Sequence, residues 1–142
     1  MEEQKYFIPE IEDIYSGYQY ERERNGKWEK VNEFSNDYDY EDNPHYALMK
    51  DIEEGKIRVP YLSKEQIRTE GWVADENFDY YFTKSDKDNC DKTLFLQVNY
   101  NYFNVPVWIT IGYENDLTDD RFSGSCPSIN ELRYICKLLK IW

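Results

Sequence analysis

Several of the residue types that build catalytic and metal sites are scarce in this chain. Its 142 residues include one histidine, three cysteines, six glycines and five prolines. The single histidine, His45, cannot supply a two-histidine zinc site, and no cysteine lies near it in the sequence. The glycines form no phosphate-binding loop, because the nearest spacing, from Gly112 to Gly124, lacks the lysine and the strand-loop-helix setting of such a loop. We therefore expect no catalytic residues, no metal site and no cofactor.

The cysteines indicate a reducing compartment. Cys90, Cys126 and Cys136 are an odd number with no close pair, which argues against a disulfide framework and favours the cytoplasm. A nucleophilic pair of one of these cysteines with His45 stays open. Such a pair also needs a third, orienting group and an oxyanion site, and no motif provides either.

Long apolar runs are also lacking. No run approaches the roughly 20 residues that a membrane-spanning helix needs. The first residues, MEEQK, are acidic and have no apolar region of the kind that a secretory signal carries. We therefore expect neither a membrane segment nor a secretion signal.

Acidic residues are abundant, and they concentrate in one part of the chain. The 29 Asp and Glu exceed the 17 Lys and Arg, which gives a net charge of −12. Residues 1–55 hold 16 acids and 6 bases, whereas residues 56–142 hold 13 and 11. Such a one-sided field repels nucleic acid and lipid headgroups and attracts basic protein surfaces. Although 18% of the residues are aromatic and bases stack on aromatic rings, we expect no direct binding to nucleic acid.

The acidic segment, residues 33–42, is the most distinctive stretch. It contains five acids, three aromatic residues and no base. On an extended chain, carboxylates at alternate positions lie about 6–7 Å apart, close to the spacing of phosphates along one nucleic-acid strand. Tyrosines between them offer flat rings with a polar tip, as interfaces favour. The predicted partner-binding residues are Asp37, Tyr38, Asp39, Tyr40, Glu41 and Asp42.

Other interpretations of this segment stay open. One alternative is that the segment is simply solvated acidic surface, as most charge runs in soluble proteins are. A calcium-binding EF-hand loop is not supported, because Asp42 stands where the loop needs glycine and Leu48 where it needs glutamate. A looser, weak cation site remains an alternative. Carboxylate pairs elsewhere, Asp75-Glu76 and Asp119-Asp120, are interpreted as turn residues.

Periodicity predicts an α+β fold in a single domain, with an antiparallel sheet, an N-terminal hairpin, two short helices and a C-terminal amphipathic helix. Asn25-Gly26 between two alternating runs predicts the hairpin, with Trp28 facing inward. The first short helix should follow Asn43-Pro44 and end near Gly55, with Tyr46, Met49 and Ile52 on its apolar face. Ser63 and Gln66 form a capping box for the second.

In the remainder of the chain, the residue pattern predicts mostly strands. Candidates are residues 57–59, 72–74, 78–83, 93–100 and 105–113, with Pro106 at a strand start or an edge. The last helix begins at Ser128, with Glu131 completing a capping box. Its apolar face should comprise Ile129, Leu132, Ile135, Cys136 and Leu139.

Three stretches of the chain carry recognisable blocks. Residues 5–21 match a PEIE…G…YE start, residues 57–72 an IRV.YL…I…GW block, and residues 122–141 an F.G…EL..LL ending. Together they resemble a family of small uncharacterised proteins carried by bacterial phages and prophages. The resemblance implies a phage-encoded protein in the cytoplasm of a bacterial host, and it brings no catalytic residues. The acidic segment and residues 43–54 are longer than in that pattern, which is a suitable place for a specific partner contact.

Together these features lead us to expect a non-enzymatic inhibitor of the anti-CRISPR kind. Its partner would be a basic host protein, a CRISPR effector or another defence nuclease, bound on its nucleic-acid-binding surface. The protein itself would be a monomer or a small homo-oligomer. The alternatives are an immunity protein that neutralises a toxin nuclease, an enzyme of phage metabolism, and an accessory protein whose acidity serves only solubility.

Overall fold

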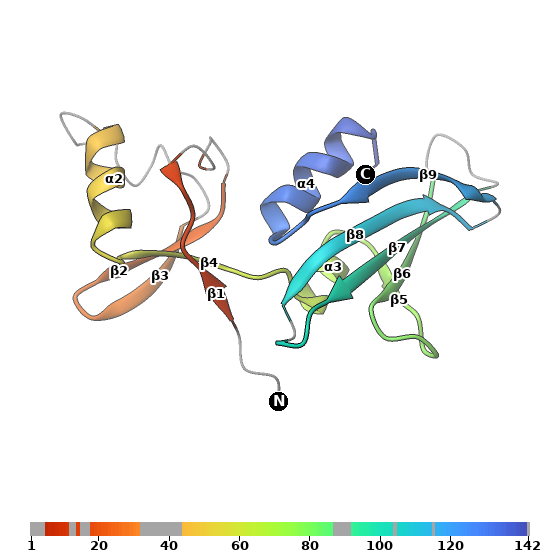
Figure 1. Ribbon diagram of the computed structural model, residues 1–142, viewed down its shortest axis with the longest axis horizontal. Helices are drawn as coiled ribbons and strands as arrows, with labels where there is room; N and C mark the ends of the chain where they lie inside the picture. The colour runs from red at the N-terminus through yellow and green to blue at the C-terminus, as the bar shows by residue number, and fades with distance from the viewer. Residues whose placement is uncertain are drawn as a thin grey trace. The chain divides into compact units, whose positions relative to one another are not determined.

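The chain forms two compact units, each with its own antiparallel sheet and its own buried core (Figure 1). The computed structural model describes residues 5–11, 14, 18–31, 44–86, 92–103, 105–114 and 116–141. Unit 1 is Met1–Tyr61 and unit 2 is Leu62–Trp142. The class is α+β, as predicted, with two sheets where the sequence analysis expected one. In the described ranges, no helix has the length and apolarity needed to cross a membrane.

Unit 1 contains a four-stranded sheet with the strand order β1-β4-β2-β3. Its elements are β1 (Tyr6–Phe7), β2 (Tyr20–Arg24), β3 (Lys27–Val31), α2 (Pro44–Glu53) and β4 (Ile57–Pro60). β2 and β3 form the predicted hairpin, with Arg24 paired to Lys27. At its turn, Asn25 has φ 53° and Gly26 φ 78°, the left-handed conformation that a two-residue type I′ turn requires.

The core of unit 1 differs from the prediction in the face that α2 presents to the sheet. Leu48 is 1% exposed and packs with tyrosines and aliphatic residues of the strands, and Ile52 joins it one turn later. Tyr46 is 64% exposed and Met49 38%, so the predicted Tyr46–Met49–Ile52 face is wrong. The i, i+4 pair of Leu48 and Ile52 also fits one helix face, and burying this pair leaves Tyr46 and Met49 on the exposed side of the helix.

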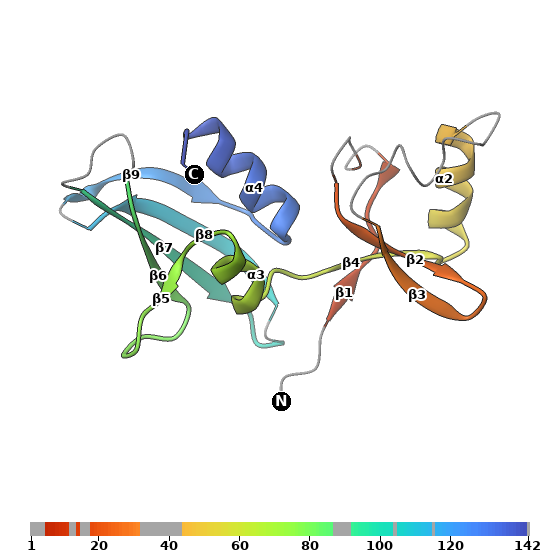
Figure 2. The same ribbon diagram turned by 180° about the vertical axis from the view of Figure 1, so that it is seen from behind.

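Unit 2 is a five-stranded antiparallel meander in the order β5-β6-β7-β8-β9, with two helices. The strands are β5 (Val73–Ala74), β6 (Tyr81–Ser85), β7 (Thr93–Tyr100), β8 (Pro106–Tyr113) and β9 (Asp116–Gly124). The helices are α3 (Lys64–Thr69) and α4 (Ile129–Leu138); Figure 2 shows them from behind. β7 has its predicted bounds, and Pro106 begins β8 as expected.

β9 is a long strand that the sequence analysis did not predict, as is the short strand β1. Asp119 and Asp120 lie within β9, not in a turn as predicted. The register between β8 and β9 shifts at Gly112, so irregular pairing interrupts the alternation by which strands are recognised. As an edge strand, β9 is also rich in polar residues, which is common where one side of a strand is unpaired. Asp75, by contrast, does form a turn, since its carboxylate accepts hydrogen bonds from the Asn77 and Phe78 amides.

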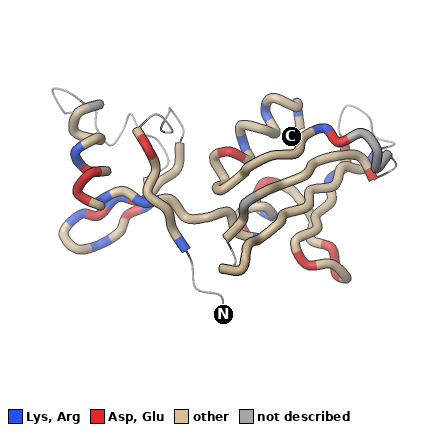
Figure 3. Tube along the Cα trace, in the orientation of Figure 1, with Lys and Arg blue, Asp and Glu red and all other residues tan. Residues whose placement is uncertain are grey.

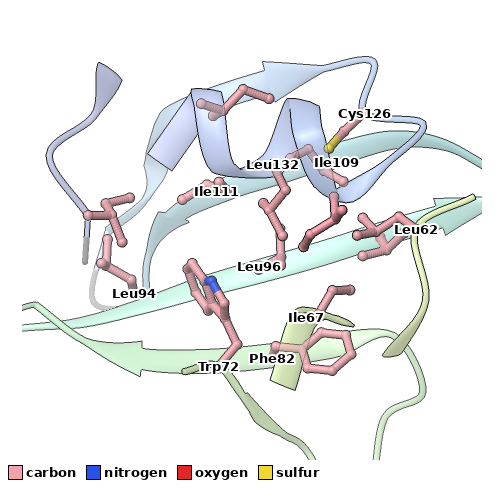
Figure 4. Close-up of a cluster of buried hydrophobic side chains, with 14 residues drawn as sticks. Leu62, Ile67, Trp72, Phe82, Leu94, Leu96, Ile109, Ile111, Cys126 and Leu132 are labelled. Atoms are coloured by element: carbon pink, nitrogen blue, oxygen red, sulfur yellow. The ribbon is translucent and has the colours of Figure 1, made fainter. Parts of the chain in front are cut away.

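The core of unit 2 lies between one face of the sheet and both helices (Figure 4). Alternate residues of the central strand, Leu94, Leu96 and Val98, point into it. α4 contributes the predicted apolar face, with Leu132 at 0% exposure. Both helix starts are capped. Ser63 and Gln66 form the predicted reciprocal capping box, and the Ser128 hydroxyl accepts from the Asn130 amide and donates to the Glu131 carboxylate.

Candidate interaction surfaces

The predicted partner-binding residues, 37–42, lie outside the described residues. The structure defines the two elements that flank them. β3 ends at Val31 and α2 begins at Pro44, and both elements belong to unit 1. Val31 packs against the core of this unit, and Leu48 of α2 is part of that core. The described residues on both sides of the acidic segment therefore belong to unit 1 and lie in or against its core.

Three cations of unit 1 are paired with carboxylates that lie outside the acidic segment. Arg22 Nη2 lies 3.0 Å from Asp51 Oδ2, Arg58 Nη2 lies 2.7 Å from Glu21 Oε1, and Lys56 Nζ lies 3.0 Å from Glu54 Oε2. The hydrogen bond to Glu54 raises the pKa of Lys56. These pairs engage three of the eight Lys and Arg residues of unit 1 with carboxylates of β2, α2 and the turn before β4.

Arg58 also holds the aromatic residues of the sheet. Its guanidinium carbon lies 3.7 Å from the centroid of the Tyr6 ring and 4.1 Å from that of Trp28. Trp28, predicted to face inward, is half-buried and does not belong to the core cluster. Because a desolvated guanidinium attracts the faces of aromatic rings, this contact joins β1, β3 and β4.

A second surface, the uncharged hairpin, is formed by β7, β8 and their connection. Residues 93–113 contain no Asp, Glu, Lys or Arg, in a chain that is 32% charged (Figure 3). On the face turned away from the core, Phe95 stacks on Tyr81 of β6 at an interplanar angle of 9°. Trp108 is 45% exposed on β8, and its indole N–H donates to the Ser123 hydroxyl. This surface combines aromatic rings with amides and hydroxyls.

The connection of the uncharged hairpin presents two aromatic side chains to solvent. Tyr102 is fully exposed and Phe103 is 72% exposed. The side-chain oxygen of Asn101 accepts hydrogen bonds from the amides of Phe103 and Val105, which orders the turn beneath them. Sequence reasoning did not single out this surface, although the run of residues without charge was a usable signal.

The cysteines that the structure describes are poor nucleophiles. Cys126 is fully buried in the core of unit 2, and burial raises the pKa of its thiol far above the ordinary range. Burial also raises the pKa of the Cys136 thiol, to about 11. Both thiols hold their protons at neutral pH, and neither supplies the thiolate that a Cys–His pair requires. His45 lies in the first turn of α2, and Cys90 is outside the described residues.

No metal site is assembled by the part of the chain that the structure describes, since no three His, Cys, Asp or Glu side chains are grouped to hold an ion.

Comparisons with protein-family models, with curated proteins and with solved structures found no match to this chain. The resemblance to phage and prophage proteins therefore stays a prediction from the sequence.

Proposed function

We propose that this chain is a phage-encoded, non-enzymatic inhibitor that binds the basic, nucleic-acid-binding surface of a defence nuclease in the bacterial cytoplasm. CRISPR effectors are the class of nuclease that we consider first. In this proposal the protein occupies the path of guide or target nucleic acid without changing its partner covalently. It therefore inhibits the nuclease at a one-to-one molar ratio.

The observation that carries the proposal is the uneven distribution of charge. Residues 1–55 hold 16 acids against 6 bases, and the acidic segment adds alternating carboxylates and tyrosines. A surface that binds nucleic acid is lined with Lys and Arg for contact with phosphates. Carboxylates spaced like phosphates are complementary to such a surface. They steer association and raise its rate at low ionic strength.

The geometry of unit 1 supports this use of the segment. The described residues nearest to it, Val31 at the end of β3 and Pro44 at the start of α2, both belong to unit 1. A segment joined to a folded unit on both sides loses less entropy on binding than a free tail does. Arg22, Lys56 and Arg58 are each paired with a carboxylate outside the acidic segment. Each such pair is neutral, so the net negative charge of the unit is unchanged by them. The exposed aromatic residues of the uncharged hairpin are suitable hot-spot anchors for the same complex.

The test is a measurement of association rates with purified CRISPR effector nucleases that are free of nucleic acid, at low and at high salt. We expect an association rate that falls steeply as salt rises, and competition with guide RNA or target DNA for the same surface. An association rate that does not depend on salt, or inhibition at substoichiometric amounts, would contradict the proposal. Failure to bind effectors together with tight binding to a toxin nuclease would favour the immunity protein.

A pair of charge-matched variants locates the surface. One variant neutralises the segment with Asp37→Asn, Asp39→Asn, Glu41→Gln and Asp42→Asn. The control removes the same number of charges from exposed carboxylates in other elements, with Glu29→Gln, Glu53→Gln, Glu65→Gln and Glu76→Gln. We expect the first variant to lose binding and the control to retain it. Equal losses would mean that only net charge matters, and full binding by the first variant would exclude the segment as the site.

A further inference from the structure

A cleft of about 720 Å³ lies within unit 2, beside the C-terminal end of α3. Its walls come from the chain between α3 and β5, from β6 and from α4, so it is formed by elements of one unit. The volume falls in the range of small-molecule sites, about 300–1,000 Å³.

The inner wall of the cleft is apolar. It includes Trp72 and Leu132, which are 2% and 0% exposed (Figure 4). It also includes Ile141, which is 8% exposed, and all three residues belong to the core of unit 2. The indole N–H of Trp72 is buried and has no hydrogen-bond partner. A buried donor without a partner costs free energy.

The rim of the cleft is positively charged, in a protein whose net charge is −12. Lys84, Arg133 and Lys137 line it, against one carboxylate, that of Glu70. Arg133 Nε donates to Glu70 Oε1 at 2.6 Å, so this carboxylate is paired with Arg133 and not with a lysine of the rim. Lys84 Nζ donates to the backbone carbonyl of Glu70 at 2.9 Å and, within the described ranges, has no ion pair.

Lys137 completes this arrangement. Its side chain is exposed and has no ion pair or hydrogen bond with any residue that the structure describes. Two ammonium groups without carboxylate partners thus border an apolar pocket in a protein that has 29 acids available to pair with them. Concave apolar lining with a few convergent charged groups is the usual composition of a ligand site.

We infer that this cleft binds a small organic anion, with a carboxylate or phosphate group on an apolar body. The anionic group lies between the ammonium groups of Lys84 and Lys137. The apolar body lies against Trp72, Cys136 and Ile141, which line the cleft. The inference does not depend on the proposed inhibitor function, because the cleft lies in unit 2 and the acidic segment in unit 1.

Calorimetric titration of the full chain with four probes tests the chemistry of the ligand. The probes are decanoate, decyl phosphate, decyltrimethylammonium and inorganic phosphate, each used below any micelle-forming concentration. We expect decanoate or decyl phosphate to bind one to one, and the tighter of the two identifies the preferred anionic group. Binding should be at least about tenfold weaker for inorganic phosphate, which lacks the apolar body, and for the cation, which has the wrong charge. Equal binding of the cation, or no binding by either anion, would overturn the inference.

Variants then locate the site. Lys137→Gln should weaken anion binding about tenfold, and Lys84→Gln with Lys137→Gln more, because each change removes a charged hydrogen-bond donor. Lys27→Gln is the matched control, since Lys27 is an exposed lysine of unit 1 outside the cleft. Thermal unfolding of each variant shows whether it is folded. Unchanged affinity in the folded Lys137→Gln variant, or an equal loss in the control, would place the site elsewhere.

Discussion

Leu132 and Leu138 show how differently two leucines of one helix contribute to stability. Leu132 is 0% exposed between α4 and the sheet, whereas Leu138 is 64% exposed. We expect Leu132→Ala to lower the free energy of unfolding of unit 2 by about 2–5 kcal/mol, because it leaves a cavity in the core. Leu138→Ala should change it by less than about 0.5 kcal/mol. Urea denaturation followed by circular dichroism measures both, and similar values would mean that α4 does not pack through its predicted face.

Because of Cys136, we expect the free energy of unfolding of unit 2 to fall as the pH rises in the alkaline range. Its thiol has an ordinary pKa of 9.0 and a folded-state pKa of about 11. Between these values the folded chain holds a proton that the unfolded chain releases. The contribution of this thiol is therefore complete below pH 9.0 and is lost as the pH rises through about 11. The slope for one such group is at most about 1.4 kcal/mol per pH unit.

The free energy of unfolding, measured against pH for the wild type and for Cys136→Ala, isolates this effect from the titration of tyrosines and lysines. We expect the two curves to run parallel below pH 9.0 and the wild-type curve to fall more steeply above it. Parallel curves throughout would show that the thiol titrates in the folded chain as it does in the unfolded chain.

At the scale of elements, the β2–β3 hairpin depends on a turn that only certain residues adopt. Gly26 has φ 78°, and a Cβ at this position would meet no atom within 4 Å. Gly26→Ala should therefore cost about 1–2 kcal/mol from backbone strain alone. Asn25→Gly, at φ 53°, should have a smaller effect, because glycine adopts positive φ without steric cost. Urea denaturation compares them, and a Gly26→Ala variant as stable as the wild type would mean that the turn can change its type.

Elements whose determinants lie close together in sequence were the ones that could be predicted. The Asn25-Gly26 hairpin, the Ser63–Gln66 capping box and β7 were each recognised from a short window and are confirmed. β9 was not, because its pairing with β8 passes through irregularities at Gly112. The face of α2 was mistaken because a helix of ten residues offers two plausible apolar rows, and contact with the sheet selects one of them.

At the scale of the whole molecule, the two units predict that unit 2 folds without unit 1. Among the described residues, its buried cluster has 14 members, and the cluster of unit 1 has five. We expect a fragment of residues 62–142 to show strand and helix signals in circular dichroism and a cooperative thermal transition. A fragment that does not unfold cooperatively would instead support the single domain predicted from the sequence.

The charge distribution is also a property of the whole molecule, and it was readable from the sequence alone. Charge is a sum over residues and needs no fold to be counted, so the strongly acidic part of the chain and the proposed basic partner follow from composition. The described residues on either side of this segment, Val31 and Pro44, both belong to unit 1. The positively charged cleft of unit 2 could not be predicted from the sequence, because Lys84 and Arg133 line it from different elements, β6 and α4.

The sequence by itself determined the features that depend on neighbours along the chain, namely the turns, the helix caps, the amphipathic last helix and the uneven charge. These depend on backbone conformation and hydrogen bonds over a few residues, or on simple addition of charges. Only the tertiary structure decided how the strands divide between two sheets, which face of α2 is buried and which cations meet around one cleft. Those outcomes depend on contacts such as that of Glu70 with Arg133, 63 positions apart, which no local pattern specifies.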